Sequence, residues 1–158
     1  MTSPTPPGTE TDPDFFKVLT EIDMISHMAK NEFERLLPPG MTQAQFGVLN
    51  RLTRLEIKET VSELAFAFQV TQPTMTSTLK KLNSKAYIFF EPDPTDKRVK
   101  RVQITASGRA MRDKIIFDMA PVLSAQINAI GPLDFETLLR DLGKIRTQFE
   151  DRMKKLPE

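Results

Sequence analysis

The stretch from Thr60 to Thr105 sets the strongest limit on how this chain can fold. Two short segments with helical periodicity, 60–68 and 71–82, are separated only by Gln69-Val70, and a β-rich pattern follows them. Apolar residues recur on one helical face of both segments. They are Val61, Leu64, Ala65 and Phe68 in the first, and Met75, Leu79, Leu82 and Ala86 in the second. Two short helices joined this tightly predict a helix-turn-helix.

The second predicted helix carries small, hydrogen-bonding or cationic residues away from its apolar face. Such a helix can enter a DNA major groove, because nothing bulky on its outer face keeps it out. The candidate DNA-contacting residues are Thr71, Gln72, Pro73, Thr74, Thr76, Ser77, Lys80 and Lys81. Side chains near the helix N-terminus can reach base edges, and we expect the two lysines to contact phosphate. Taken alone, a solvated polar face explains the same pattern.

A β-hairpin is predicted directly after this helix. Tyr87–Glu91 and Val99–Ile104 are β-rich, and residues 92–96 have the composition of a turn. Cations follow the turn, so the hairpin predicts a wing that reaches phosphates or the minor groove. The candidate wing residues are Asp96, Lys97, Arg98 and Lys100. We expect Arg98 to enter the minor groove and Asp96 to hold Arg98 or the turn; a plain turn residue is the alternative for Asp96.

Long apolar stripes lie on predicted helices near both ends of the chain. The first starts at Asp12 or Asp14 and runs to Leu36, the second covers residues 105–130 with Pro121 inside, and the third follows Asp134. Three such stripes exceed what one winged lobe can bury, so pairing with a second copy in a two-fold dimer is the simplest solution. The candidate dimerisation residues are Phe15, Leu19, Ile22, Leu138, Leu142, Ile145 and Phe149.

The predicted fold class is therefore mainly α with a small β wing, a winged helix-turn-helix with long terminal helices. We expect residues 1–12 to form a flexible tail, because they are rich in Pro, Thr and Gly. Residues 13–40 and 105–158 are expected to form a helical dimerisation lobe, and residues 41–104 a DNA-binding lobe. The predicted N-caps of the helices are Thr42, Thr60, Thr71 and Asp134.

The distribution of charge supports a nucleic-acid surface more than the total does. The 158-residue chain has a net charge of only +1. Residues 1–70 hold six Lys/Arg against ten Asp/Glu, residues 71–101 hold seven against three, and residues 102–158 hold nine against eight. The differences are −4, +4 and +1, so the positive block coincides with the predicted second helix and wing.

Composition argues against several other classes of protein. There is no cysteine and only one histidine, His27, so thiol redox sensing is excluded and no metal site is expected. No phosphate-cradling glycine loop and no nucleophile with an identifiable base occur, so we expect neither catalytic residues nor a cofactor. No long apolar run and no signal-peptide pattern occur, so we expect no membrane contact and a cytoplasmic location.

Five stretches of the chain together resemble one family. They are MTQAQF at 41–46, SELA at 62–65, VTQPTMT at 70–76, DPTDKR at 93–98 and ITASGR at 104–109. This order is similar to that of the MarR family of transcriptional regulators, and the resemblance covers the chain from about Phe15 onward. The chain departs from many relatives at Ala86, where they have Gly, and at Lys97, where they have Arg.

The resemblance implies a homodimer in which the terminal helices pair and each subunit docks a winged helix on half of a palindromic site. It also suggests a small aromatic or lipophilic effector bound between the lobes. We therefore expect a sequence-specific transcriptional regulator that acts as a repressor. Its expected partners are double-stranded DNA and a second copy of the same chain. The alternative is a winged-helix module that binds protein and not DNA, and the dependence of DNA affinity on salt separates the two.

Overall fold

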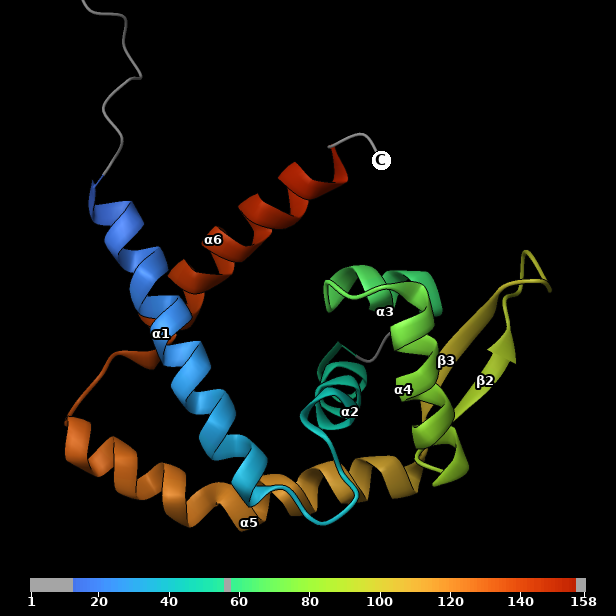
Figure 1. The fold of residues 1–158 in the computed structure, drawn as a ribbon, viewed down its shortest axis with the longest axis horizontal. Helices are drawn as coiled ribbons and strands as arrows, with labels where there is room; N and C mark the ends of the chain where they lie inside the picture. Colours follow the sequence, from blue (N-terminus) through green and yellow to red (C-terminus); the bar gives the residue numbers. More distant parts are fainter. Residues whose placement is uncertain (1–12, 56–57, 156–158) are drawn as a thin grey trace, which may run out of the picture. The chain divides into compact units, whose positions relative to one another are not determined.

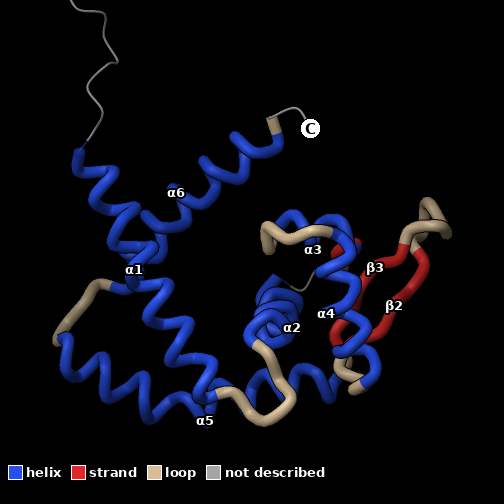
Figure 2. The backbone as a smooth tube through the Cα atoms, viewed as in Figure 1, coloured by secondary structure: helices blue, strands red, loops and turns tan. Residues whose placement is uncertain are grey.

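The computed structural model describes residues 13–55 and 58–155, and it is mainly α-helical with one small antiparallel sheet (Figures 1 and 2). The elements in chain order are α1 (Pro13–Leu36), α2 (Gln43–Leu55), β1 (Glu59–Thr60), α3 (Val61–Ala67), α4 (Gln72–Ser84), β2 (Ile88–Pro92), β3 (Lys100–Ile104), α5 (Ala106–Ile130) and α6 (Phe135–Lys154). The predicted fold class, a winged helix-turn-helix with a β wing, is confirmed. The expected tail at residues 1–12 lies outside the described residues.

Side-chain caps fix where the helices begin. The Thr60 hydroxyl accepts a hydrogen bond from the Glu63 amide at 3.1 Å, and the Glu63 carboxylate accepts one from the Thr60 amide at 2.7 Å. This reciprocal pair is a capping box, and it starts α3. The Thr71 hydroxyl caps α4 by accepting from the Thr74 amide at 3.3 Å, and Asp134 caps α6. The helix starts follow from local sequence, as predicted.

The sheet has the strand order β1-β3-β2, and both pairings are antiparallel. Strands β2 and β3 form the predicted wing hairpin, with Phe90 opposite Val102 near its centre. The sequence pattern does not predict β1, because two residues are too few to show an alternation. Through β1, the backbone just before α3 is paired with the wing, since Thr60 lies opposite Arg101.

The helix-turn-helix has its own apolar core. Helix α2 contacts α4 and β3, and α3 contacts α4 (Figure 1). The largest fully buried side chains here include Val48, Leu49, Leu52, Leu64, Leu79, Leu82, Ile88 and Val102. The Phe33 ring of α1 lies 5.1 Å from the Phe46 ring of α2, measured between centroids. This core leaves the opposite face of α4 uncovered.

The turn after α4 differs from the sequence prediction. The helix ends at Ser84, so Ala86, expected on the buried stripe, lies beyond it and is exposed. Ala86 has a φ of +57°, which an L residue with a side chain adopts at a cost. The Ala86 carbonyl accepts hydrogen bonds from the Thr105 and Ser107 hydroxyls at 2.7 and 2.8 Å. These bonds fasten the start of α5 to the turn.

The contacts divide the chain into two compact units, Met1–Asp118 and Met119–Glu158. The boundary falls inside α5, which continues through Pro121. In the second unit, none of the described residues of α6 is buried. The expected division into a dimerisation lobe and a DNA-binding lobe stays a prediction. No described helix is long and apolar enough to cross a membrane.

Candidate nucleic-acid interface

Helix α4 buries one face and exposes the other, as the sequence predicts. Its buried side chains are Met75, Leu79 and Leu82. Of the candidate DNA-contacting residues, Thr71, Gln72, Pro73, Thr74, Ser77, Lys80 and Lys81 are exposed, and Thr76 is half-buried. The exposed set lies from the N-cap through the third turn, so it can meet a groove without rearrangement of the core.

Side-chain and backbone hydrogen bonds hold the start of α4. The hydroxyls of Thr71 and Thr74 lie 2.8 Å apart in a hydrogen bond, in addition to the cap between them. Before them, Gln69 has a φ of +52°, and its side-chain amide donates to the Phe66 carbonyl at 2.5 Å. The Val70 amide donates to the Ala65 carbonyl at 3.0 Å. The α3–α4 turn is therefore closed by its own hydrogen bonds, which fix the direction in which α4 begins.

The wing presents its cations to solvent. Lys97, Arg98 and Lys100 are all exposed, and 91% of the Arg98 side chain is accessible. The backbone of the tip is closed by two hydrogen bonds, from the Asp93 amide to the Val99 carbonyl and from the Val99 amide to the Asp96 carbonyl, each 2.9 Å long. An exposed guanidinium on a closed turn is suited to insertion into a narrow groove.

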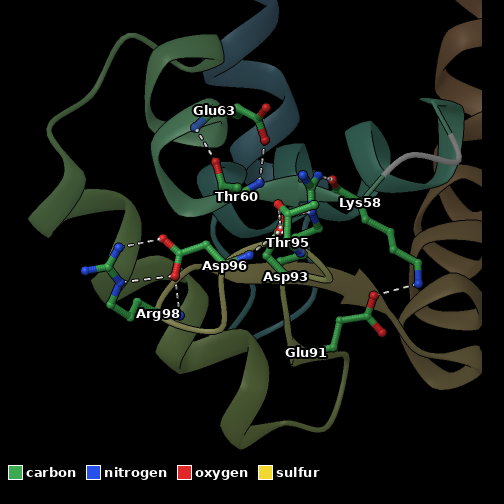
Figure 3. A network of polar contacts seen from close by, with 9 residues as sticks. Lys58, Thr60, Glu63, Glu91, Asp93, Thr95, Asp96 and Arg98 are labelled. Carbon is green, nitrogen blue, oxygen red and sulfur yellow. Dashed lines mark hydrogen bonds and ion pairs between the residues drawn. The ribbon is translucent and has the colours of Figure 1, made fainter.

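Asp96 accepts hydrogen bonds from both the backbone and the side chain of Arg98 (Figure 3). Its carboxylate accepts from Nε and Nη2 of Arg98 at 3.1 Å each, and also from the Arg98 amide at 3.0 Å. The Arg98 guanidinium, followed by its amide, holds the pKa of the Asp96 carboxyl below its usual value. Of the two interpretations left open for Asp96, the contacts support the one in which it orients Arg98.

Asp93 organises the hairpin tip, and it was not among the predicted site residues. It is 4% exposed, and its Oδ1 accepts from the Thr95 hydroxyl at 2.6 Å, the Thr95 amide at 2.8 Å and the Asp96 amide at 3.1 Å. Its Oδ2 accepts from Nε of Arg101. The Thr95 hydroxyl and amide, followed by Arg101, hold the pKa of this carboxyl well below its usual range. An aspartate that begins a turn signals this kind of bonding to the backbone that follows it.

Arg101 is placed differently from the other wing cations. It directly follows Lys100 in the sequence, but it is half-buried and ion-paired to Asp93. Its Nη1 also donates to the Lys58 carbonyl at 2.6 Å. Nearby, the Lys58 ammonium lies 2.6 Å from the Glu91 carboxylate, and Arg51 of α2 forms a two-point contact with the buried Glu59 (Figure 3 shows Lys58 and Glu91). Ion pairs therefore connect the base of the wing to the segment before α3.

The candidate dimerisation residues fall in both units. Phe15, Leu19 and Ile22 lie on α1 in the first unit, and Leu138, Leu142, Ile145 and Phe149 lie on α6 in the second. Phe15, Leu138 and Phe149 are exposed, and the other four are half-buried. Each unit therefore carries apolar side chains that remain accessible to solvent in the single chain.

Among the described residues, no group of three or more His, Asp or Glu side chains could hold a metal ion. The acidic groups of the wing are occupied by arginine, lysine and backbone donors. The wing therefore presents exposed cations on a hydrogen-bonded turn.

The chain is similar to known proteins in sequence and in fold. Residues 40–99 match the sequence model of the MarR family. The transcriptional regulator BldR from Sulfolobus solfataricus is similar in structure, with a TM-score of 0.75, 22% identity, and coverage of 89% of this chain and 99% of BldR.

Two further solved structures are similar in the same way. A mutant MarR from E. coli, complexed with operator DNA, has a TM-score of 0.64 and 25% identity over 87% of this chain and 99% of that one. S. aureus MepR in a DNA-binding conformation has a TM-score of 0.64 and 26% identity over 84% of this chain and 98% of that one. The similarity extends well beyond the segment 40–99.

Proposed function

Because residues 40–99 match the MarR family model, we propose that this chain is a MarR-family transcriptional regulator, a homodimeric repressor that binds a pseudo-palindromic operator. Each subunit places α4 in a major groove and Arg98 in the adjacent minor groove. The two recognition helices of the dimer then enter successive major grooves about one helical turn, roughly 34 Å, apart.

One observation carries the DNA-binding part of this proposal. The uncovered face of α4 and the uncovered guanidinium of Arg98 belong to one unit, and β3 connects the wing to the core that supports α4. Residues 71–101 also hold the positive block of the sequence. A small polar face for base edges together with cations for phosphate is the pattern that duplex DNA requires.

The dimer rests on a second observation. None of the described residues of α6 is buried, although Leu138, Leu139 and Phe149 are large and apolar and between 43% and 69% exposed. Several large apolar side chains exposed on one helix favour a partner, and a two-fold copy is the commonest one. Pairing would also supply the second half-site contact that a palindrome offers.

Repression and release by a small aromatic or lipophilic effector complete the proposal, and the resemblance to the MarR family suggests both. A repressor blocks polymerase by occupying the operator. An effector releases it by binding one conformation of the dimer better than the conformation that fits DNA.

Selection of bound sequences from random duplexes tests the function directly. A palindromic consensus with half-sites one helical turn apart is expected. Binding should then be measured against salt, because release of counterions makes a phosphate-bound complex weaken steeply as salt rises. Absence of any enriched duplex, or affinity that does not change with salt, would favour the protein-binding module instead.

A further inference from the structure

Arg101 lies at a junction between two parts of the first unit. Its Nη1 donates to the carbonyl of Lys58, which directly precedes β1, and its Nε donates to the carboxylate of Asp93 at the start of the hairpin tip. Arg101 is also paired through its backbone with Thr60, the N-cap of α3. One guanidinium therefore joins the start of the helix-turn-helix to the start of the tip.

From Asp93 the contacts continue to the residue that we expect to reach DNA. Asp93 accepts from the Thr95 and Asp96 amides, and Asp96 accepts from the amide and guanidinium of Arg98 (Figure 3). Each link is a directional hydrogen bond to a charged group, so a shift at one end is transmitted to the next. The series runs from the Lys58 carbonyl through Arg101, Asp93 and Asp96 to Arg98.

A second contact reinforces the attachment of the wing. The Lys58 ammonium lies 2.6 Å from Glu91 of β2, so Lys58 is held at its backbone by β3 and at its side chain by β2. The Lys58–Glu91 pair is partly exposed, and exposed ion pairs add little to stability. Arg101 pairs with the buried Asp93, so its replacement also costs stability, although Asp93 keeps its hydrogen bonds from Thr95 and Asp96.

Placement matters because α4 and Arg98 must contact one duplex at the same time. A docking group needs to be held within about 0.5 Å of its productive position to contribute fully. Lys97 and Arg98 of the hairpin tip are exposed, and the buried residue of the tip is the polar Asp93. Hydrogen bonds must supply the rigidity that packing does not.

We propose that Arg101 is a positioning residue for DNA binding, which sets the position of Arg98 relative to α4 by tying Asp93 to the Lys58 carbonyl. The inference rests on the proposed function and adds a residue that acts through Arg98 and not by contact with DNA. It predicts that the contribution of Arg98 to affinity depends on Arg101.

A double-mutant cycle on the full chain measures that dependence. The probe is the duplex selected for the native protein, and the variants are Arg98→Ala, Arg101→Gln and the double variant. In the native background, Arg98→Ala should weaken binding by about 5- to 150-fold. In the Arg101→Gln background, the same change should weaken binding by less than about threefold, because an Arg98 that is out of position already contributes little to the affinity.

Two further variants separate geometry from charge. Arg101→Lys keeps the charge but has one ammonium in place of two separated donors, so it should behave like Arg101→Gln within about threefold. Lys80→Gln removes a cation of α4 that is not one of the residues linking Lys58 to Arg98. Its penalty should add to that of Arg98→Ala, since independent sites are additive within about twofold.

Amide hydrogen exchange reports on the hairpin without DNA. The amides of Thr95 and Asp96 donate hydrogen bonds to Asp93. In Arg101→Gln these two amides should exchange at least about tenfold faster, while the amides of Met75 and Leu79 in α4 stay protected. This also verifies that the variant is folded.

The outcomes distinguish the inference from the function it rests on. Strong coupling between Arg98 and Arg101, with faster exchange at the tip, supports the positioning role. Additive penalties with unchanged exchange would overturn it and leave the regulator intact. A native protein that binds no duplex would overturn the proposed function and this inference with it.

Discussion

Gly108 of α5 lies against the backbone carbonyl of Tyr87, and a Cβ atom at position 108 would overlap that oxygen and crowd the Ile104 side chain. The Gly108 amide donates to the Thr105 hydroxyl at 3.0 Å, so the same residue also closes the first turn of the helix. The Thr-x-x-Gly sequence that follows the wing is thus required by a close approach of two backbones.

Replacement of Gly108 by alanine should destabilise the fold. The neighbour is a backbone carbonyl and cannot move aside as a flexible side chain can, so we expect a loss of about 1–3 kcal/mol. Urea unfolding followed by circular dichroism measures it. Gly143→Ala in α6 is the matched control, because no atom lies within 4 Å of its added Cβ, and it should not lose stability. Equal effects at both positions would contradict the close approach.

Replacement of Ala86 by glycine should stabilise the protein. Ala86 has a φ of +57°, where a Cβ is strained, and we expect relief of that strain to give about 0.5–1 kcal/mol after the entropy of glycine is subtracted. Thermal unfolding by calorimetry is the measurement. Ala110→Gly, in the helical interior of α5, should instead lose about 0.5–1 kcal/mol. A loss at position 86 would show that its conformation is not strained.

Removal of the Arg98 side chain should weaken operator binding by about 1–3 kcal/mol without unfolding the protein. If Arg98 lies close to the phosphates that line the groove, its removal should also reduce the magnitude of the slope of log affinity against log salt by about one. Fluorescence anisotropy at several salt concentrations measures both. Lys144→Ala, a cation of α6 paired with Asp141, is the charge-matched control and should leave affinity unchanged. Unaltered binding by Arg98→Ala would remove its minor-groove role.

A charge placed in the apolar stripe of α6 should prevent dimerisation. Leu142→Asp would leave an unpaired carboxylate in the expected interface, which costs several times the thermal energy, on the order of 3–5 kcal/mol. Sedimentation velocity distinguishes dimer from monomer. Thr147→Asp adds the same charge at an exposed position on another face of α6 and should sediment as the native protein does. A dimeric Leu142→Asp variant would show that the interface lies elsewhere.

The wing should make stability depend on pH in the acid range. Asp93 and Asp96 have folded-state pKa values below their usual ones, so the stability they add is complete above about pH 4, the unfolded pKa, and is lost as pH falls through the folded values. Urea unfolding from pH 3 to pH 7 measures this. The difference between native protein and Asp93→Asn should be constant above that limit and shrink below it. A difference that grows on acidification would contradict the sign of the shift.

Local chemistry accounts for what could be predicted. Thr60 with Glu63, and Thr71 with Thr74, form their caps within three residues, so sequence spacing alone identifies them. The exposed face of α4 followed in the same way from its buried stripe. The wing hairpin was predicted from β-rich runs on either side of a proline-rich turn.

Contacts to distant backbone groups were not predictable. Arg101 donates to the carbonyl of Lys58, and a carbonyl is present at every residue, so no side-chain pattern reveals it. The position of Lys58 beside Arg101 depends on β1, which is too short to have a periodicity. Asp93 is buried and accepts from Arg101, eight residues further along the chain. Only its place at the start of a turn gave a local signal.

The uncovered apolar face of α6 has a consequence for how such a regulator responds to its own abundance. If two copies must meet before either can hold an operator, the amount of competent protein grows with about the square of the subunit concentration when subunits are scarce. Operator occupancy would then rise steeply over a narrow range of expression, and dilution alone would be enough to reverse it.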